Sequence, residues 1–240
     1  MNDQNNPTQQ IALSVILLQA TSVLILCGQT NAESFRVTNP TSLQKVMPVK
    51  EAAGPDAETL RIVMSRGEFE PAQIVVHAGD EPLRNVRVAV SGLSGSNGRA
   101  LPSDRIVVNP MGFIHIDGPT RGRSELGFRS EGGDVPDVLL PNRPMNIPAG
   151  RRQPYYITVR TLCSDQAGEY RGTVAVSADG EQGAQIPLIV RVYDIVLPIK
   201  SHLKTAFGID SGYRTIEGTD PAADFKTLLD YSKFLLEHRI

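Results

Sequence analysis

Between residues 60 and 192 the sequence contains short segments in which apolar and polar residues alternate. The apolar positions of the clearest segments are Leu60, Ile62 and Met64; Val86, Val88 and Val90; Tyr155, Ile157 and Val159; Val174 and Val176; and Ile186, Leu188, Val190 and Val192. Successive side chains of a β-strand point to opposite sides, so alternation places one side on a core and the other in water. We therefore expect strands at these segments and at residues 73–77 and 106–116.

Clusters of turn-forming residues separate these segments. Gly, Pro, Asp and Ser gather at residues 79–82, 91–98 and 179–181. Several short strands divided by such turns are typical of antiparallel sandwiches. The pattern predicts a mainly β fold, an immunoglobulin-like antiparallel β-sandwich that occupies residues 33–199.

One short run makes the sandwich prediction more specific. The run contains Asp165, Gly168 and Tyr170, and it leads into the strand predicted around Val174 and Val176. In immunoglobulin-like sandwiches a Tyr at the start of a strand donates its hydroxyl to backbone a few residues upstream, which fixes the crossing between sheets. We expect this tyrosine corner at Tyr170; the alternative is that Tyr170 only fills the core.

Residues 118–150 lack a period and are rich in Gly and Pro, which predicts a long loop. Long loops without secondary structure are usually functional or packed on another domain. Asp134 and Asp137 lie in this segment, but their spacing differs from that of a calcium loop. The sequence therefore favours turn-forming roles for both.

The first 32 residues differ from the rest of the chain. Residues 11–27 are nearly all apolar, and Thr30 and Ala32 suit the small-residue positions of a signal-peptidase site. We expect a signal peptide at residues 1–32, export, and no stable membrane span in the mature chain. Residues 1–10 contain no Lys or Arg, which leaves an uncleaved anchor as the alternative, although 17 residues are few for a span.

The remaining composition argues against several classes of site. Cys163 has no partner once the signal peptide is removed, so it is expected to be a buried structural thiol. The four histidines, His77, His115, His202 and His238, have no Cys or His at ligand spacing, so we expect no metal and no cofactor. A net charge of −2 without a block of basic residues argues against nucleic acid as a partner.

The period changes after Pro198. Residues 203–209 predict a short strand, and Asp220 followed by Pro221 predicts the start of a helix. The helix carries an apolar stripe formed by Phe225, Leu228, Leu229, Leu235 and Leu236. We interpret residues 200–240 as a single β-α unit, the first strand and helix of an incomplete (β/α)8 barrel.

Three runs in the sequence resemble the front of glycoside hydrolase family 123. They are residues 66–73 (RGEFEPAQ), residues 168–174 (GEYRGTV), and Leu197-Pro198 followed by residues 203–208 (LKTAFG). The resemblance covers roughly residues 35–240. It implies an exported protein with an N-terminal sandwich and a barrel similar to those of β-N-acetylgalactosaminidases, in which a substrate amide and neighbouring acids perform the hydrolysis.

No residue of this sequence matches the acids that the family uses on later barrel strands, so we assign no catalytic residue. In barrels the active face gathers at the carboxyl ends of the strands. Asp210, Tyr213 and Arg214 follow the predicted barrel strand, so they are candidates for substrate binding in a completed barrel. The alternative is that these residues only shape the loop.

These observations predict a non-catalytic N-terminal sandwich module of an exported, N-acetylhexosaminidase-like glycoside hydrolase, inactive alone. A separately encoded barrel domain is a possible partner that would restore activity. The alternative is a stand-alone carbohydrate-binding or cell-surface module that binds glycans. That alternative has little aromatic surface available, because the sequence has no Trp and only 5% aromatic residues.

Overall fold

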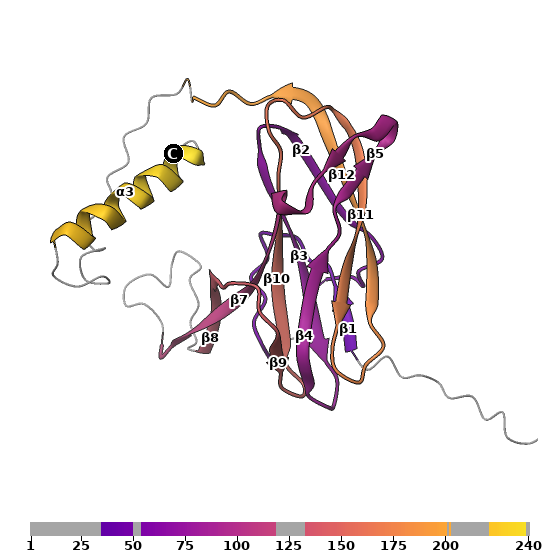
Figure 1. The fold of residues 1–240 in the computed structure, drawn as a ribbon. Coiled ribbons are helices and arrows are strands. Elements are labelled where there is room, and N and C mark those ends of the chain that lie inside the picture. The colour runs from indigo at the N-terminus through magenta and orange to yellow at the C-terminus, as the bar shows by residue number, and fades with distance from the viewer. Residues whose placement is uncertain (1–34, 50–53, 119–132, 201, 203–220, 239–240) are drawn as a thin grey trace, which may run out of the picture. The chain divides into compact units, whose positions relative to one another are not determined.

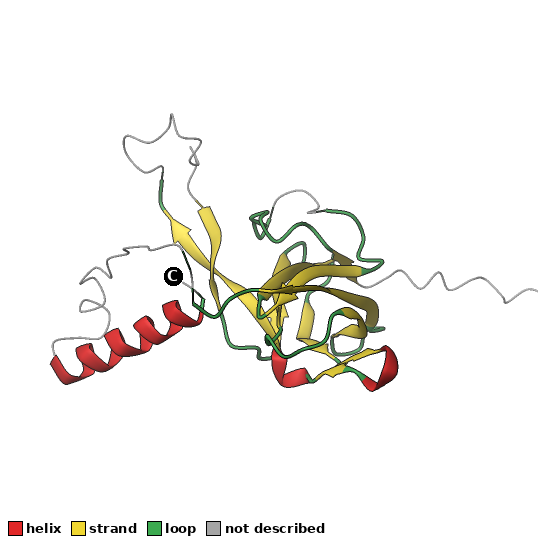
Figure 2. Cartoon of the chain, turned by 90° about the horizontal axis from the view of Figure 1, so that it is seen from above, coloured by secondary structure: helices red, strands yellow, loops and turns green. Residues whose placement is uncertain are grey.

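The structure, a computed structural model, describes residues 35–49, 54–118, 133–200, 202 and 221–238. These residues form a β-sandwich, drawn in Figures 1 and 2, and one helix. The predicted signal peptide, the predicted barrel strand at 203–209 and the candidates Asp210, Tyr213 and Arg214 all lie outside the described residues.

The first sheet is antiparallel throughout. Its strands, in spatial order, are β1 (Phe35–Thr38), β3 (Phe69–Ala78), β10 (Arg152–Arg160), β7 (Ile106–Ile116) and β8 (Gly133–Leu139). Figures 1 and 2 show that the far part of β7 and its partner β8 project away from the body of the sandwich. Ile114 and Ile116 at that end are accordingly exposed.

The second sheet contains one parallel pair, β12 with β2. Its strands, in spatial order, are β2 (Leu60–Arg66), β12 (Ala184–Val196), β11 (Gly168–Ser177), β4 (Leu83–Val90) and β9 (Met145–Ile147), with β5 (Leu93–Gly95) and β6 (Ala100–Leu101) joined at the side of β11. Short 3-10 turns lie at Ser96–Gly98 and Ser103–Arg105. The predicted mainly β sandwich is therefore confirmed.

The core consists of the apolar positions that the alternation predicted. Ile74, Tyr155 and Ile157 from the first sheet and Val174 and Leu188 from the second are completely buried. All five belong to one continuous apolar cluster. Each buried side chain of this size stabilises the fold by about 1.5–3 kcal/mol relative to exposure, before entropy is counted.

The predicted tyrosine corner is present. The hydroxyl of Tyr170, a residue 2% exposed, donates a hydrogen bond of 2.6 Å to the carbonyl of Gln166. Gly168, two residues before Tyr170, has a φ of +146° that disfavours other residues, and a Cβ there would lie 2.5 Å from a guanidinium nitrogen of Arg99. The crossing between the sheets therefore explains why Gly168 and Tyr170 occur in the run at residues 168–174.

The outer side of the first sheet is covered by the segment that follows β1. Gln73, which is buried on that side, donates to the carbonyls of Thr41 (2.9 Å) and Gln44 (3.1 Å). Val46 from the covering segment packs on Val75 of β3. The second sheet has no such cover among the described residues.

The predicted long loop at 118–150 is only partly a loop. Residues 133–139 form β8 and residues 145–147 form β9. The turn roles expected for Asp134 and Asp137 are wrong, because both residues lie within β8. An edge strand that contains Pro136 needs no alternating pattern, so periodicity does not predict it.

The predicted helix is α3 (Pro221–Glu237), which begins at Pro221 as expected. Of its apolar stripe, Phe225, Leu229 and Leu236 are exposed. No helix in the described ranges combines the length and apolar character needed to cross a membrane. Whether α3 belongs to a barrel unit stays a prediction.

Replacing Tyr170 with Phe should reduce the free energy of unfolding by about 1–3 kcal/mol, because the Gln166 carbonyl loses its donor inside the fold. Urea unfolding followed by circular dichroism measures the change. Tyr193→Phe is the matched control, since Tyr193 is 44% exposed and should change stability by less than about 0.5 kcal/mol. Equal effects of the two substitutions would refute the tyrosine corner as a stabilising element.

Candidate functional site

A glycoside hydrolase site usually needs two carboxyl groups facing one cleft. Glu68 and Glu70 are two acids separated by one residue, and they lie in one of the runs that carry the family resemblance. The other acids of the sandwich are distributed over its edges and surfaces. The chemical role of each acid follows from its bonding partner.

Glu68 stabilises the tight turn that leads from β2 in the second sheet to β3 in the first. Its carboxylate accepts the backbone N–H of Ser65, and its own N–H donates 3.0 Å to the hydroxyl of Thr161. That hydroxyl in turn donates 2.7 Å to the carbonyl of Ser65. Gly67, with φ of +77°, forms the turn. Glu68 is therefore a structural residue.

Glu70 lies beside Glu68 at the end of the sandwich. Burial, and to a smaller extent the charge of Glu68, raises the pKa of Glu70. Phe69, between the two, lies under the guanidinium of Arg160, whose carbon is 5.0 Å from the ring centre. These contacts are those of a folded strand end, where a ring, a cation and a carboxylate pack against one another.

Five other carboxylates of the sandwich form close ion pairs with a base. The pairs are Asp56 with Arg36, Asp134 with His115 (2.8 Å), Asp165 with Arg105 (2.6 Å), Asp194 with Arg66 (2.7 Å) and Glu169 with Arg171. An acid engaged in an ion pair at the surface does not act as a proton donor to a substrate in a cleft.

The histidines in the sandwich are separated from one another. His77 on β3 bonds to the hydroxyl of Thr38 at 2.9 Å, whereas His115 on β7 bonds to Asp134. Contact with Asp134 raises the pKa of His115, and contact with His115 lowers the pKa of Asp134. Within the described ranges no group of His, Cys, Asp and Glu has the arrangement of a metal site.

Cys163 differs slightly from the expectation. It is half-buried rather than buried, and its sulfur lies 3.6 Å from the carbonyl of Leu197. The thiol therefore contacts the strand end at which the chain leaves the sandwich. That contact is consistent with the predicted structural role.

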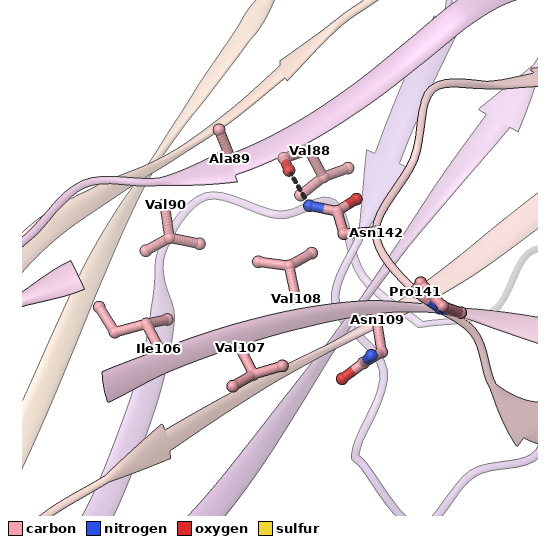
Figure 3. Close-up of a pocket in the computed structure, with 9 residues that line it drawn as sticks. All are labelled: Val88, Ala89, Val90, Ile106, Val107, Val108, Asn109, Pro141 and Asn142. Atoms are coloured by element: carbon pink, nitrogen blue, oxygen red, sulfur yellow. Dashed lines mark hydrogen bonds between the residues drawn. The ribbon is translucent and has the colours of Figure 1, made fainter. Parts of the chain in front are cut away.

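A pocket of about 450 Å³ opens at the side of the sandwich between β4 and β7 (Figure 3). Its walls are apolar and include Val88, Val90 and Val108. The two amides at its rim are engaged: Asn142 donates 3.0 Å to the Val88 carbonyl, and Asn109 donates 2.9 Å to the Leu140 carbonyl. The pocket contains no charged residue, so it offers no group for acid–base chemistry.

The solvent side of β2, β12 and β11 has a different character. It presents the exposed residues Arg61, Arg171 and Arg191, which we call the arginine face. Arg61 and Arg171 flank Ile189 in register, and Arg191 lies two residues further along β12. Sequence reasoning missed this set, because each Arg occupies an ordinary polar position of an alternating segment, and the strand pairing alone brings them together.

Residues 45–178 match the glycoside hydrolase 123 N-terminal domain family. The chain belongs to this family. The resemblance predicted from the three sequence runs is therefore confirmed. No curated protein sequence matches the chain.

Among solved structures, the chain is similar to a family 123 glycoside hydrolase from Clostridium perfringens, studied for glycolipid glycan hydrolysis. The TM-score is 0.59 at 18% identity, and the match covers 68% of this chain and 28% of that enzyme. The chain thus spans less than a third of that protein. At this identity the likeness shows a shared fold.

Two further structures match with low scores. The macrocyclization catalyst AvmM matches with a TM-score of 0.35 and 7% identity, over 69% of this chain and 93% of that one. The fimbrial subunit MyfA from Yersinia enterocolitica matches with a TM-score of 0.32 and 11% identity, over 66% of this chain and 98% of that one. Neither likeness carries an argument about this chain.

The stability of the sandwich should rise between about pH 4 and pH 6.5. Burial, then the charges of Arg152 and Arg36, lowers the pKa of His77 from 6.5 to about 4. In that window the unfolded chain binds a proton at His77 that the folded chain does not, so acid favours unfolding. The urea concentration at the midpoint of unfolding should therefore rise with pH across this range. In His77→Gln it should rise less steeply.

His115→Gln is the control for this measurement. Since the pKa of His115 is raised in the folded chain, its contribution to stability is present below its unfolded pKa and is lost as pH rises through the folded value. Removing His115 should therefore leave the rise between pH 4 and 6.5 in place. A pH profile of His77→Gln identical to that of the wild type would disprove the assignment.

Proposed function

We propose that this chain is the non-catalytic N-terminal β-sandwich module of an exported glycoside hydrolase that acts on N-acetylhexosamine-containing glycans. The observation that carries the proposal is the match of residues 45–178 to the glycoside hydrolase 123 N-terminal domain family. The bonding of several sandwich carboxylates agrees with it: Glu68 holds a turn, and Asp56, Asp134, Asp165, Asp194 and Glu169 are paired with bases.

In this proposal the hydrolytic chemistry belongs to a barrel outside the sandwich, supplied by the same polypeptide or by a separately encoded partner. Asp210, Tyr213 and Arg214 would then contribute to substrate binding at the first barrel strand. An aspartate and an arginine suit sugar hydroxyls, and a tyrosine ring suits the apolar side of a sugar.

The second candidate is a stand-alone carbohydrate-binding or cell-surface module. The arginine face favours it, because Arg191 and Tyr193 provide a cation and an aromatic ring on an open sheet surface, with the Arg191 guanidinium carbon 5.5 Å from the ring centre. Both candidates assign binding rather than chemistry to the sandwich.

The purified chain should release no 4-nitrophenol from 4-nitrophenyl N-acetyl-β-galactosaminide above the rate without protein. An active β-N-acetylhexosaminidase assayed in parallel is the positive control. The physical reason is that, in this proposal, the acids that act on the substrate lie on a barrel outside the sandwich. Turnover that copurifies with the chain and is abolished in Glu70→Gln would overturn the proposal.

Export predicts that the mature protein begins at Glu33, because Thr30 and Ala32 suit a signal-peptidase site. The full chain, expressed in a bacterium and fractionated, should yield a released species whose N-terminus is read by mass spectrometry. Ala32→Arg should block this cleavage, whereas Gln29→Arg, outside the two small-residue positions, should leave it unchanged. Intact chain in the membrane fraction would contradict the expectation.

A further inference from the structure

We infer that the arginine face is a binding surface for an anionic polysaccharide, one that carries sulfate or carboxylate groups. The face is formed by the outward side chains of Arg61, Arg171 and Arg191 on three adjacent strands. This inference does not rest on the proposed function, because it depends on the charges of the sheet and not on any hydrolytic activity.

The strand register determines the spacing of the charges. Arg61 on β2 and Arg171 on β11 both pair with Ile189, so they lie on opposite sides of β12 in one row. Two strand spacings separate them by about 10 Å, and Arg191 lies about 7 Å further along β12. The three cations therefore form a triangle that suits several charged groups of one extended ligand.

The balance of charge on this face favours an anionic partner. Glu169, the carboxylate on the same rows, forms an ion pair with Arg171. Within the described part of the chain, no ion pair involves Arg61 or Arg191. Three arginines against one glutamate leave an excess of two positive charges, on a chain whose net charge is −2.

All three cations of the face are arginines, and the chemistry of the guanidinium group indicates which anions suit them. A guanidinium presents planar paired donors that match a carboxylate or sulfate group, and it loses its water more readily than an ammonium. Its charge is also constant across physiological pH. The face is therefore built to recognise oxyanions.

An aromatic ring and a small hollow adjoin the arginines. Tyr193, 44% exposed, lies beneath Arg191. A pocket of about 400 Å³ lies beside them, lined by residues 167–169 and 191–194. Its two carboxylates are both engaged in ion pairs, Glu169 with Arg171 and Asp194 with Arg66. An aromatic ring beside polar groups suits the apolar side of a sugar ring, which favours a polysaccharide over a lipid headgroup.

The surroundings keep the face open. The outer side of the first sheet is covered by residues 39–48, through bonds such as that from Gln73 to Thr41. On the second sheet, by contrast, Val63 and Tyr193 are 52% and 44% exposed beside the arginines. A ligand can therefore lie across β2, β12 and β11 without displacing any described part of the chain.

The test is binding of the full chain to heparin and chondroitin sulfate oligosaccharides, measured by isothermal titration calorimetry. Neutral chitohexaose and anionic phosphatidylglycerol vesicles are measured in parallel. We expect both sulfated glycans to bind, with affinity that falls as NaCl is raised from 50 to about 300 mM because charges at a surface are screened. Chitohexaose and the vesicles should not bind.

Two triple variants with the same change in charge locate the binding. Arg61→Gln with Arg171→Gln and Arg191→Gln should weaken binding at least tenfold. The control variant combines Lys45→Gln, Arg143→Gln and Lys200→Gln, three exposed residues outside β2, β11 and β12. It should retain binding within about twofold. Tyr193→Ala should weaken binding severalfold without changing its salt dependence. Circular dichroism confirms that each variant is folded.

Four results would overturn the inference. They are an absence of binding to either sulfated glycan, equal loss in the two triple variants, equal binding of chitohexaose, and binding to the vesicles alone. The hydrolysis assay is independent of all four, so a failure here leaves the proposed function as it stands.

Discussion

The hydrogen bond from the Tyr170 hydroxyl to the Gln166 carbonyl fixes the passage from one sheet to the other. The chain leaves β10, in the middle of the first sheet, and enters β11, in the middle of the second, through residues 161–167. Asp165 reinforces the passage by accepting from Arg105 and from the N–H of Leu162, each at 2.6 Å. β10 and β11 are the central strands of the two sheets, so the placement of one sheet relative to the other depends on this crossing.

The sequence predicts strands such as β2 and β11 well, because each of them buries one side and leaves the other more exposed. The strand predicted at residues 106–116 matches β7 in full, and Tyr170 was identifiable from its neighbours. Edge strands are different. β8 and β9 were missed because a short strand with one partner, or one containing Pro136, needs no alternating pattern to form.

The candidate surface was not predictable for a related reason. Arg61 and Arg171 are distant in the sequence, and only the parallel pairing of β2 with β12, together with the antiparallel pairing of β12 with β11, makes them neighbours. Their individual positions are ordinary outward positions of strands. Periodicity indicates which side of a strand faces water, but it does not indicate which strands lie side by side.

The two runs that carry the family resemblance within the described residues are explained by folding. Gly67 and Glu68 form a turn between the two sheets that Thr161 closes, and Gly168 and Tyr170 form the crossing. Gly172 is required as well, because a Cβ there would lie 2.5 Å from a methyl carbon of Leu93. These motifs therefore identify the fold of a domain rather than a reaction.

What distinguishes this sandwich as a functional surface is the unequal use of its charges. Some of its carboxylates, such as Asp165 and Asp194, form ion pairs with arginines. Arg61 and Arg191, by contrast, have no acidic partner in the described part of the chain and lie on the uncovered sheet. An open sheet surface with unpaired arginines is suited to hold an anionic ligand in place.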